Sequence, residues 1–191
     1  IQGDGGGSGY TLDSTYVVYD IDQQNNQWWS KPSFRTTDEY VQSLVYFTNV
    51  YQKLGVMWKF YKPDGTQYGQ DLIWDDAVPN PRDYGWDYWS WYWVAWGFLI
   101  DGNLMAQIPG RYKIDIYVND GSGYKYQKSD TYVVAWNFTE HRLCKDVQTS
   151  DPYLPISETN VFYQTDEKAV TWANFDLVAQ SGRVNHKFFE P

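Results

Sequence analysis

Apolar and polar residues alternate with a period of two along most of the chain, a pattern typical of half-buried strands. The clearest case is the segment 111–118, where every second residue is apolar. Similar or largely apolar runs predict five more strands, at 15–21, 41–50, 56–61, 68–74 and 124–134. No segment repeats its apolar residues convincingly at helical spacing. We therefore expect an all-β protein.

Turn-forming residues separate these runs. Pro63 presets φ and Gly65 permits a positive φ, which predicts a tight turn between the strands 56–61 and 68–74. Polar or glycine-rich segments at 23–27, 101–103 and 119–123 predict further turns, and the segment 75–85 reads as a loop. Short strands joined in this way predict an antiparallel β-sandwich.

An aromatic stretch at 84–96 contains eight Trp and Tyr residues among thirteen. Read as a strand, it places Trp89, Trp91 and Trp93 on one face. The other face then carries Tyr88, Ser90, Tyr92, Val94 and Trp96. A helix is the alternative, because Trp86, Trp89, Trp93 and Trp96 also fit a helical stripe. The strand is favoured because strong helix formers are nearly absent from the stretch.

The second aromatic row of such a strand needs a partner, since three or four exposed rings exceed the apolar patch of an ordinary monomer. The row is either covered by the segments 23–33 and 75–85, or it forms an assembly surface, or it stacks on sugar rings. The candidates for assembly or stacking are Trp86, Tyr88, Trp89, Trp91, Tyr92, Trp93 and Trp96. Polar partners for a sugar would be Asn80, Arg82, Asp87 and Ser90.

The chain contains an internal repeat. Shifted by 128 positions, Phe34–Pro63 matches Phe162–Pro191 without a gap, with 11 of 30 pairs identical. Tyr10-Thr11 aligns with Phe138-Thr139 at the same offset. We therefore expect a glycine-rich lead-in at 1–9, a first copy at 10–137 and an incomplete second copy at 138–191. Either the sequence is a fragment of a longer protein, which is the favoured interpretation, or strands from a neighbour complete the second copy and cover its apolar face.

The repeated unit resembles the immunoglobulin-like β-sandwich repeats of secreted and cell-surface microbial proteins. The residues that carry the resemblance are Trp58–Gly65 and Pro109–Tyr117. The resemblance implies a non-catalytic module and transfers no active-site residue. The aromatic stretch departs from the family's plain pattern, which leaves a binding role open.

Composition argues against several kinds of partner and favours a location outside the cell or on its surface. A net charge of −9 argues against nucleic acid and anionic membrane surfaces as partners, and no apolar run is long enough to span a bilayer. A single cysteine, Cys144, excludes an internal disulfide. The richness in Trp, Tyr, Asn, Gln and Gly, with few Lys and Glu, favours a secreted or cell-surface protein.

Candidate chemistry is sparse. The two histidines, His141 and His186, lack metal-ligand spacing with Cys144, and no motif for a catalytic nucleophile, phosphate loop or zinc protease occurs. Asn137 opens a glycosylation sequon. Four carboxylates are weak calcium candidates, and less favoured candidates for a glycosidase pair: Asp75, Asp76, Asp83 and Asp87.

These observations favour a non-catalytic structural module of an extracellular or cell-surface protein, part of a repeat protein or a self-assembling polymer such as a filament or surface layer. Its partners would be other copies or neighbouring domains, joined by β-strand pairing. The alternative is a carbohydrate-binding module that uses the aromatic stretch, with glycans as partners.

Overall fold

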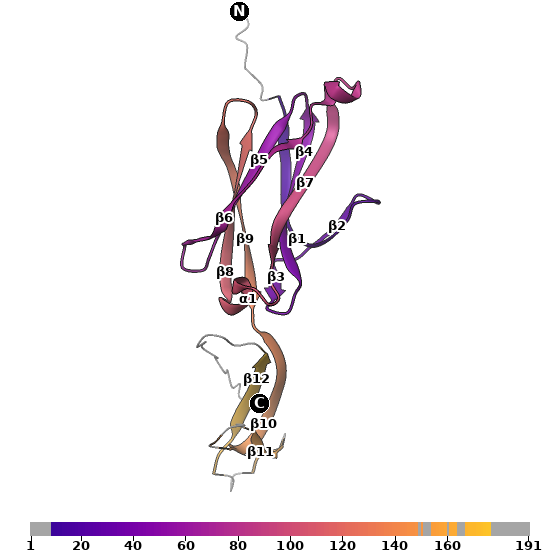
Figure 1. Cartoon of the computed structure of the whole chain (residues 1–191). Coiled ribbons are helices and arrows are strands. Elements are labelled where there is room, and N and C mark those ends of the chain that lie inside the picture. The colour runs from indigo at the N-terminus through magenta and orange to yellow at the C-terminus, as the bar shows by residue number, and fades with distance from the viewer. Residues whose placement is uncertain (1–8, 149, 151–153, 160, 164–166, 177–191) are drawn as a thin grey trace, which may run out of the picture. The chain divides into compact units, whose positions relative to one another are not determined.

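The computed structural model describes residues 9–148, 150, 154–159, 161–163 and 167–176, and their regular structure is almost entirely β-strand (Figure 1). The all-β fold class is therefore confirmed. The chain divides into two compact units, the first ending at Ala135 and the second beginning at Trp136. The glycine-rich lead-in, apart from Gly9, lies outside the described residues, as does the last part of the predicted second copy, with His186.

One sheet of the first unit has four strands in the order β2-β1-β4-β7, all antiparallel. Its central strands, β1 and β4, lie between β2 and β7. The predicted aromatic strand is β7, at the edge of the sheet, and the stretch 84–88 precedes it as turn and loop. The strand bounds are β1 Thr11–Asp22, β2 Gln27–Ser30, β4 Tyr40–Val50 and β7 Trp89–Leu99.

The other sheet has five strands in the order β3-β9-β8-β5-β6. Its pairings are antiparallel except that between β3 and β9, which is parallel over three residue pairs. The glycine of the predicted turn, Gly65, joins β5 to β6 with φ +82°. The bounds are β3 Ser33–Arg35, β5 Leu54–Tyr61, β6 Gln67–Val78, β8 Gly110–Asn119 and β9 Tyr124–Ala135.

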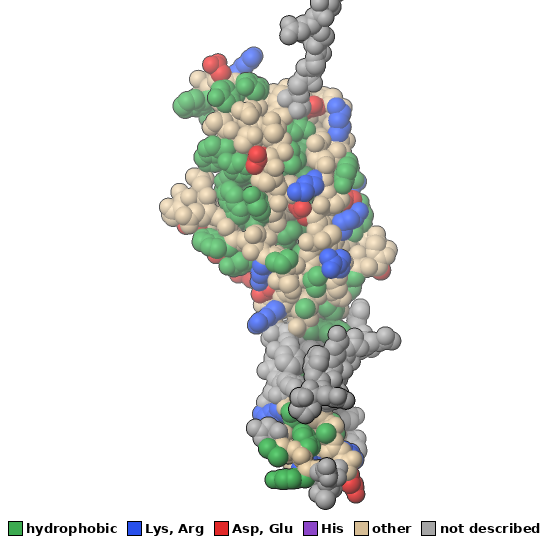
Figure 2. All heavy atoms as spheres, turned by 180° about the vertical axis from the view of Figure 1, so that it is seen from behind, with side chains coloured by type: hydrophobic (Ala, Val, Ile, Leu, Met, Phe, Trp, Pro, Cys, Tyr) green, Lys and Arg blue, Asp and Glu red, His purple; other side chains and the backbone are tan. Residues whose placement is uncertain are grey.

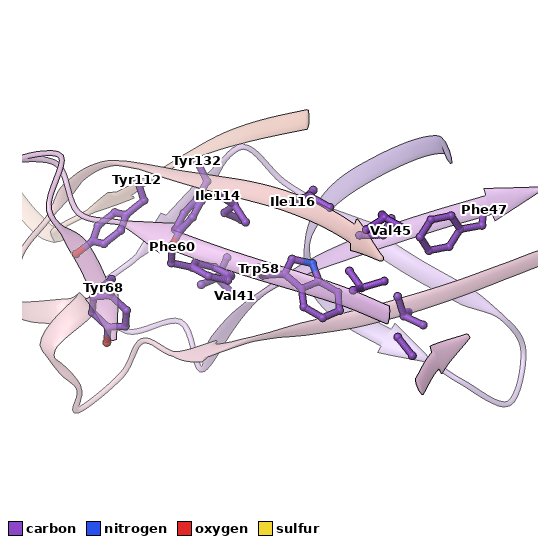
Figure 3. Close-up of a cluster of buried hydrophobic side chains, with 14 of the residues drawn as sticks. Val41, Val45, Phe47, Trp58, Phe60, Tyr68, Tyr112, Ile114, Ile116 and Tyr132 are labelled. Atoms are coloured by element: carbon purple, nitrogen blue, oxygen red, sulfur yellow. The ribbon is translucent and has the colours of Figure 1, made fainter. Parts of the chain in front are cut away.

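The two sheets face each other across a single core, the two-layer arrangement expected from the alternating pattern (Figure 3). Trp58 and Phe60 of β5 are fully buried, and Phe60 meets Phe98 of β7 edge to face at 5.0 Å. Burying each such large side chain contributes about 1.5–3 kcal/mol. The core therefore ties β7 firmly to the opposite sheet.

The predicted loop at 75–85 is partly wrong. Strand β6 continues to Val78, because Ala77 and Val78 are buried and Val78 pairs with Leu54. A 3₁₀ turn, η1 (Pro81–Tyr84), follows, and a four-residue helix, α1 (Leu104–Gln107), precedes β8. Short turns of this kind carry no helical periodicity, so the sequence pattern does not predict them.

The described part of the second unit is a three-stranded sheet in the order β11-β10-β12, which follows the order β2-β1-β4 of the first unit. Cys144 pairs with Glu158 and Val170, as Val18 pairs with Ser30 and Gln42. A register shift also falls at the corresponding place in both units. The bounds are β10 Asn137–Val147, β11 Pro155–Glu158 and β12 Val170–Asp176.

The register differs in one detail from the repeat in the sequence. An offset of 128 relates β12 to β4, but an offset of 126 relates β10 to β1. Phe138 therefore lies at the place of Leu12, not of Tyr10. The second unit therefore has two more residues between β10 and β12 than the first has between β1 and β4, which an ungapped comparison cannot detect.

Candidate binding groove at the aromatic edge strand

The aromatic residues of β7 fall on both faces of its sheet. Tyr92 and Phe98 pack against the core, and Val94 is buried in it. Trp91 and Trp93 lie on the outer face, opposite Thr48 and Tyr46 of β4. The division of the two rows is therefore as predicted for these residues.

The alternation predicts that Trp89 shares a face with Trp91 and Trp93, and this is wrong. Its cross-strand partner Val50 is fully buried, and Trp89 itself packs against the core, 5.6 Å from Tyr92. The reason lies on β4, where Asn49 has φ +53° and interrupts the regular alternation. The indole N–H of Trp89 donates to the Pro79 carbonyl at 2.8 Å, which fixes the ring on the inner side.

Trp96 is neither buried in the core nor on the outer face of the sheet. It projects from the core side but remains 40% exposed at the margin of the two sheets. Its ring meets Trp58 at 6.3 Å and Trp74 of β6 at 6.4 Å, both edge to face. Trp96 thus belongs to the junction between β7 and β6.

An aromatic cluster covers the outer face of the sheet. The Trp28 ring of β2 lies 5.7 Å from Tyr16, 5.9 Å from Tyr46 and 6.3 Å from Trp93. Tyr46 also stacks on Trp91 with an interplanar angle of 7°. Part of the outer row is therefore covered by the segment 23–33, as one of the three interpretations proposed, but Trp91 remains 45% exposed.

A groove of about 640 Å³ runs beside β7, within the size range of small-molecule sites. In Figure 2 hydrophobic side chains gather on the side of the first unit where β7 lies. The groove is lined by Gln23 and Asn26 of the β1–β2 turn, Trp74 of β6, and residues at or just before β7: Trp86, Tyr88, Trp89, Ser90, Trp91, Tyr92, Trp93, Val94 and Ala95. Trp96 does not line it.

Local contacts hold the lining side chains in place. The Tyr88 ring stacks on Tyr51 at 5.1 Å, and η1 before it is capped by Asn80, whose Oδ1 accepts from the Arg82 backbone N–H. On the other side Asn26, with φ +52°, accepts a hydrogen bond from the Trp93 indole N–H at 3.3 Å. The groove is thus formed before any ligand arrives, which lowers the entropic cost of binding.

The four residues predicted as polar partners for a sugar lie in different places. Ser90 lines the groove, whereas Asp87 is exposed between Trp86 and Tyr88. The Asn80 side chain is occupied in the η1 cap, and Arg82 belongs to the same turn. Gln23, Asn26 and Trp74 were missed as groove residues, because no sequence pattern relates their distant segments to β7.

The calcium candidates are not gathered into a metal site. Asp75 accepts a hydrogen bond from the Tyr124 hydroxyl at 2.6 Å, and Asp76 forms an ion pair with Lys53 at 2.8 Å. Among the described residues, no group of three or more His, Cys, Asp or Glu side chains could hold a metal ion. Adjacent residues of β6 project to opposite faces, which separates these two carboxylates.

Three candidates of the second unit lie on β10. Cys144 is a buried free thiol on β10, and its Sγ lies 3.6 Å from the Val170 carbonyl oxygen. Asn137 and His141 also belong to β10 by their backbone, and their side chains lie outside the described part of the chain. The use of the sequon stays a prediction.

Comparison with known proteins gives only distant similarities. No family model and no curated protein matches the sequence. Among solved structures, the chain is similar to the C-terminal domain of Wzt, with 11% identity, a TM-score of 0.41, and coverage of 68% of this chain and 75% of that one.

A β-glucuronidase of Parabacteroides merdae gives 8% identity and a TM-score of 0.38 over 72% of this chain. The chain spans only 14% of that enzyme. These two similarities assign neither a family nor an activity to the chain.

Proposed function

We propose that the first unit is a non-catalytic carbohydrate-binding module whose ligand lies in the groove beside β7. The observation that carries the proposal is the combination of exposed Trp rings with amide and hydroxyl groups in one preformed groove. Sugar rings present apolar C–H faces that stack on aromatic rings, and hydroxyls that exchange hydrogen bonds with amides. The groove offers both kinds of contact side by side.

The two most exposed rings of the groove are only partly covered by the protein. Trp86 is 61% exposed and Trp91 is 45% exposed, so much of their apolar surface contacts water. Soluble proteins seldom gather large aromatic side chains on one exposed surface unless that surface binds something. This argument applies to a saccharide and to a protein partner alike, so the polar groups of the groove decide between them.

The second unit provides an internal control for the aromatic cluster behind the groove. Its three-stranded sheet forms with the same strand order and a corresponding register. The places of Tyr16 and Tyr46 are taken there by Arg142 and Asn174. Pro155, which pairs with Val147, lies where Trp28 pairs with Ile21 in the first unit. The sheet does not require aromatic residues at these places, which favours a role in binding for those of the first unit.

Retention on insoluble polysaccharides tests the proposal. The full chain is mixed with cellulose, chitin, xylan, mannan and an α-glucan, and the bound fraction is measured. Trp86→Ala and Trp91→Ala are expected to reduce retention on the bound polysaccharide at least tenfold, since each removes a stacking ring. The matched control is Trp29→Ala, because Trp29 is similarly exposed at 41% but does not line the groove. Wild-type retention on none of the panel would refute the proposal.

A second candidate function is the structural module of a repeat protein or polymer. The observation that favours it is the recurrence of the β2-β1-β4 sheet order in the second unit. Location outside the cell or on its surface also belongs to this proposal. Among the described residues no helix is long and apolar enough to cross a membrane. Light scattering and electron microscopy test assembly, and a protein that stays monomeric at high concentration would count against it.

A further inference from the structure

The side chains of the groove carry no formal charge. Its twelve lining residues are aromatic, aliphatic, hydroxyl-bearing or amide-bearing, with no Lys, Arg, His, Asp or Glu among them. Sites that recognise carboxylates or sulfates use Arg or Lys, because charge-assisted hydrogen bonds must replace the hydration of the anion. The groove offers an anionic sugar no such replacement.

The segments that border the groove are acidic. Asp75 and Asp76 follow Trp74 on β6, Asp87 follows Trp86, and Asp22 precedes Gln23 at the hairpin turn. All four are exposed or half-buried, so each adds negative potential near the groove. The whole chain has a net charge of −9, which adds to the same field.

A basic residue beside these carboxylates is already engaged. Lys53 forms an ion pair with Asp76 at 2.8 Å. The hydrogen bond and charge of Asp76, with the charges of Asp75 and Asp83, raise the pKa of Lys53. Lys53 therefore offsets carboxylates of the rim and is not placed to receive an anionic ligand.

The polar groups of the groove suit hydroxyls. The Asn26 Oδ1 accepts from the Trp93 indole, which leaves the amide NH₂ group as a donor towards a ligand. The Gln23 amide and the Ser90 hydroxyl can both donate and accept. Sugar hydroxyls match such groups in either direction.

We propose that the groove selects uncharged saccharide chains and rejects polysaccharides that carry carboxylates or sulfates. This inference rests on the proposed carbohydrate-binding function. It assigns selection to the neutral lining and the acidic rim, and it makes Asn26 a specificity-determining residue. Replacing the Asn26 amide by a carboxylate keeps the acceptor for Trp93 but removes the donors and brings a charge into the groove.

Matched ligands test the inference. Affinity of the full chain is measured for a neutral polysaccharide retained in the panel and for its carboxymethylated derivative, at low and at high salt. Binding to the neutral polymer is expected to be at least tenfold tighter at low salt. The difference should shrink at high salt, because salt screens exposed charges. Equal or tighter binding of the derivative at low salt would overturn the inference, and so would a difference that salt leaves unchanged.

Two variants test which residues cause the preference for the neutral polymer. Asn26→Asp is expected to weaken binding of the neutral polymer at least tenfold while the protein remains folded. Asp87→Lys should strengthen binding of the derivative by no more than about fivefold, since one exposed charge contributes little. Unaltered binding by both variants would refute this assignment. If no saccharide of either charge binds, the proposed function itself fails, and that result is distinct from binding without selection.

Discussion

The close approach of β7 to β4 at Gly97 gives the sharpest prediction about the fold that presents the groove. A Cβ atom added to Gly97 would lie 1.8 Å from the Val41 carbonyl oxygen and 2.6 Å from the Gln42 Cα. Both are backbone atoms of the paired strand, so neither can rotate away. In Gly97→Ala the two strands must therefore separate by about 1 Å or more, about a fifth of the roughly 4.7–4.9 Å between neighbouring strands.

Such a separation breaks the ladder around the pair Gln42 and Gly97. The loss of two or three hydrogen bonds, each contributing about 0.5–1.5 kcal/mol, predicts a destabilisation of about 2–4 kcal/mol. This agrees with the usual cost of overpacking. It is a large fraction of a domain's net stability of about 5–15 kcal/mol.

Gly65→Ala is the matched control. Gly65 has a positive φ, but an added Cβ would find no atom within 4 Å, so backbone strain is its only cost, about 1–2 kcal/mol. Urea unfolding gives the free energies, and hydrogen exchange with mass spectrometry locates the loss of protection in β4 and β7. If Gly97→Ala costs no more than Gly65→Ala, or leaves exchange in β7 unchanged, the reasoning from close approach is refuted.

Three further variants test the outer cluster, the core and its titration. Trp28→Ile should cost about 1–2 kcal/mol in urea unfolding, because ring contacts worth about 0.5–1.5 kcal/mol each are replaced in part; global unfolding would contradict the inference that the sheet does not require an aromatic residue there. Trp58→Ala should cost about 3–5 kcal/mol, since Trp58 is fully buried, and a cost below 1 kcal/mol would contradict its place in the core. Burial raises the pKa of Tyr132, so ionisation above about pH 10 favours the unfolded chain, and stability is complete below that pH and falls above it. Tyr132→Phe should flatten this alkaline loss in unfolding measured from pH 8 to 12, and an unchanged slope would contradict the assignment.

The strands were predictable because the period-two pattern reflects burial, which is a property of neighbouring residues. Segment 111–118 was recognised for this reason, and it forms most of β8. Trp89 was misplaced because its direction depends on the backbone of another strand at Asn49. Strand alternation alone cannot contain that information.

Only the aromatic residues of the groove could be predicted from the sequence. The exposed rings of β7 stood out in the sequence, and the need for a partner followed from their area. The opposite wall of the groove could not be inferred. Asn26 lies in the β1–β2 turn, far from β7 in the sequence, and its contact with Trp93 arises only in the folded protein. Trp28 was visible as an aromatic residue, but its contacts with Tyr46 and Trp93 arise from pairing between distant segments.

The central claim is that a saccharide binds between the Trp rings beside β7. Indole N–H signals in a ¹H–¹⁵N NMR spectrum report this directly, because each Trp side chain gives its own signal. On titration with an oligosaccharide of the retained polymer, the signals of Trp74, Trp86 and Trp91 are expected to shift together with one affinity. Those of buried Trp58 and exposed Trp29 should stay in place. Shifts confined to Trp residues outside the groove, or no shifts at saturating ligand, would contradict the account.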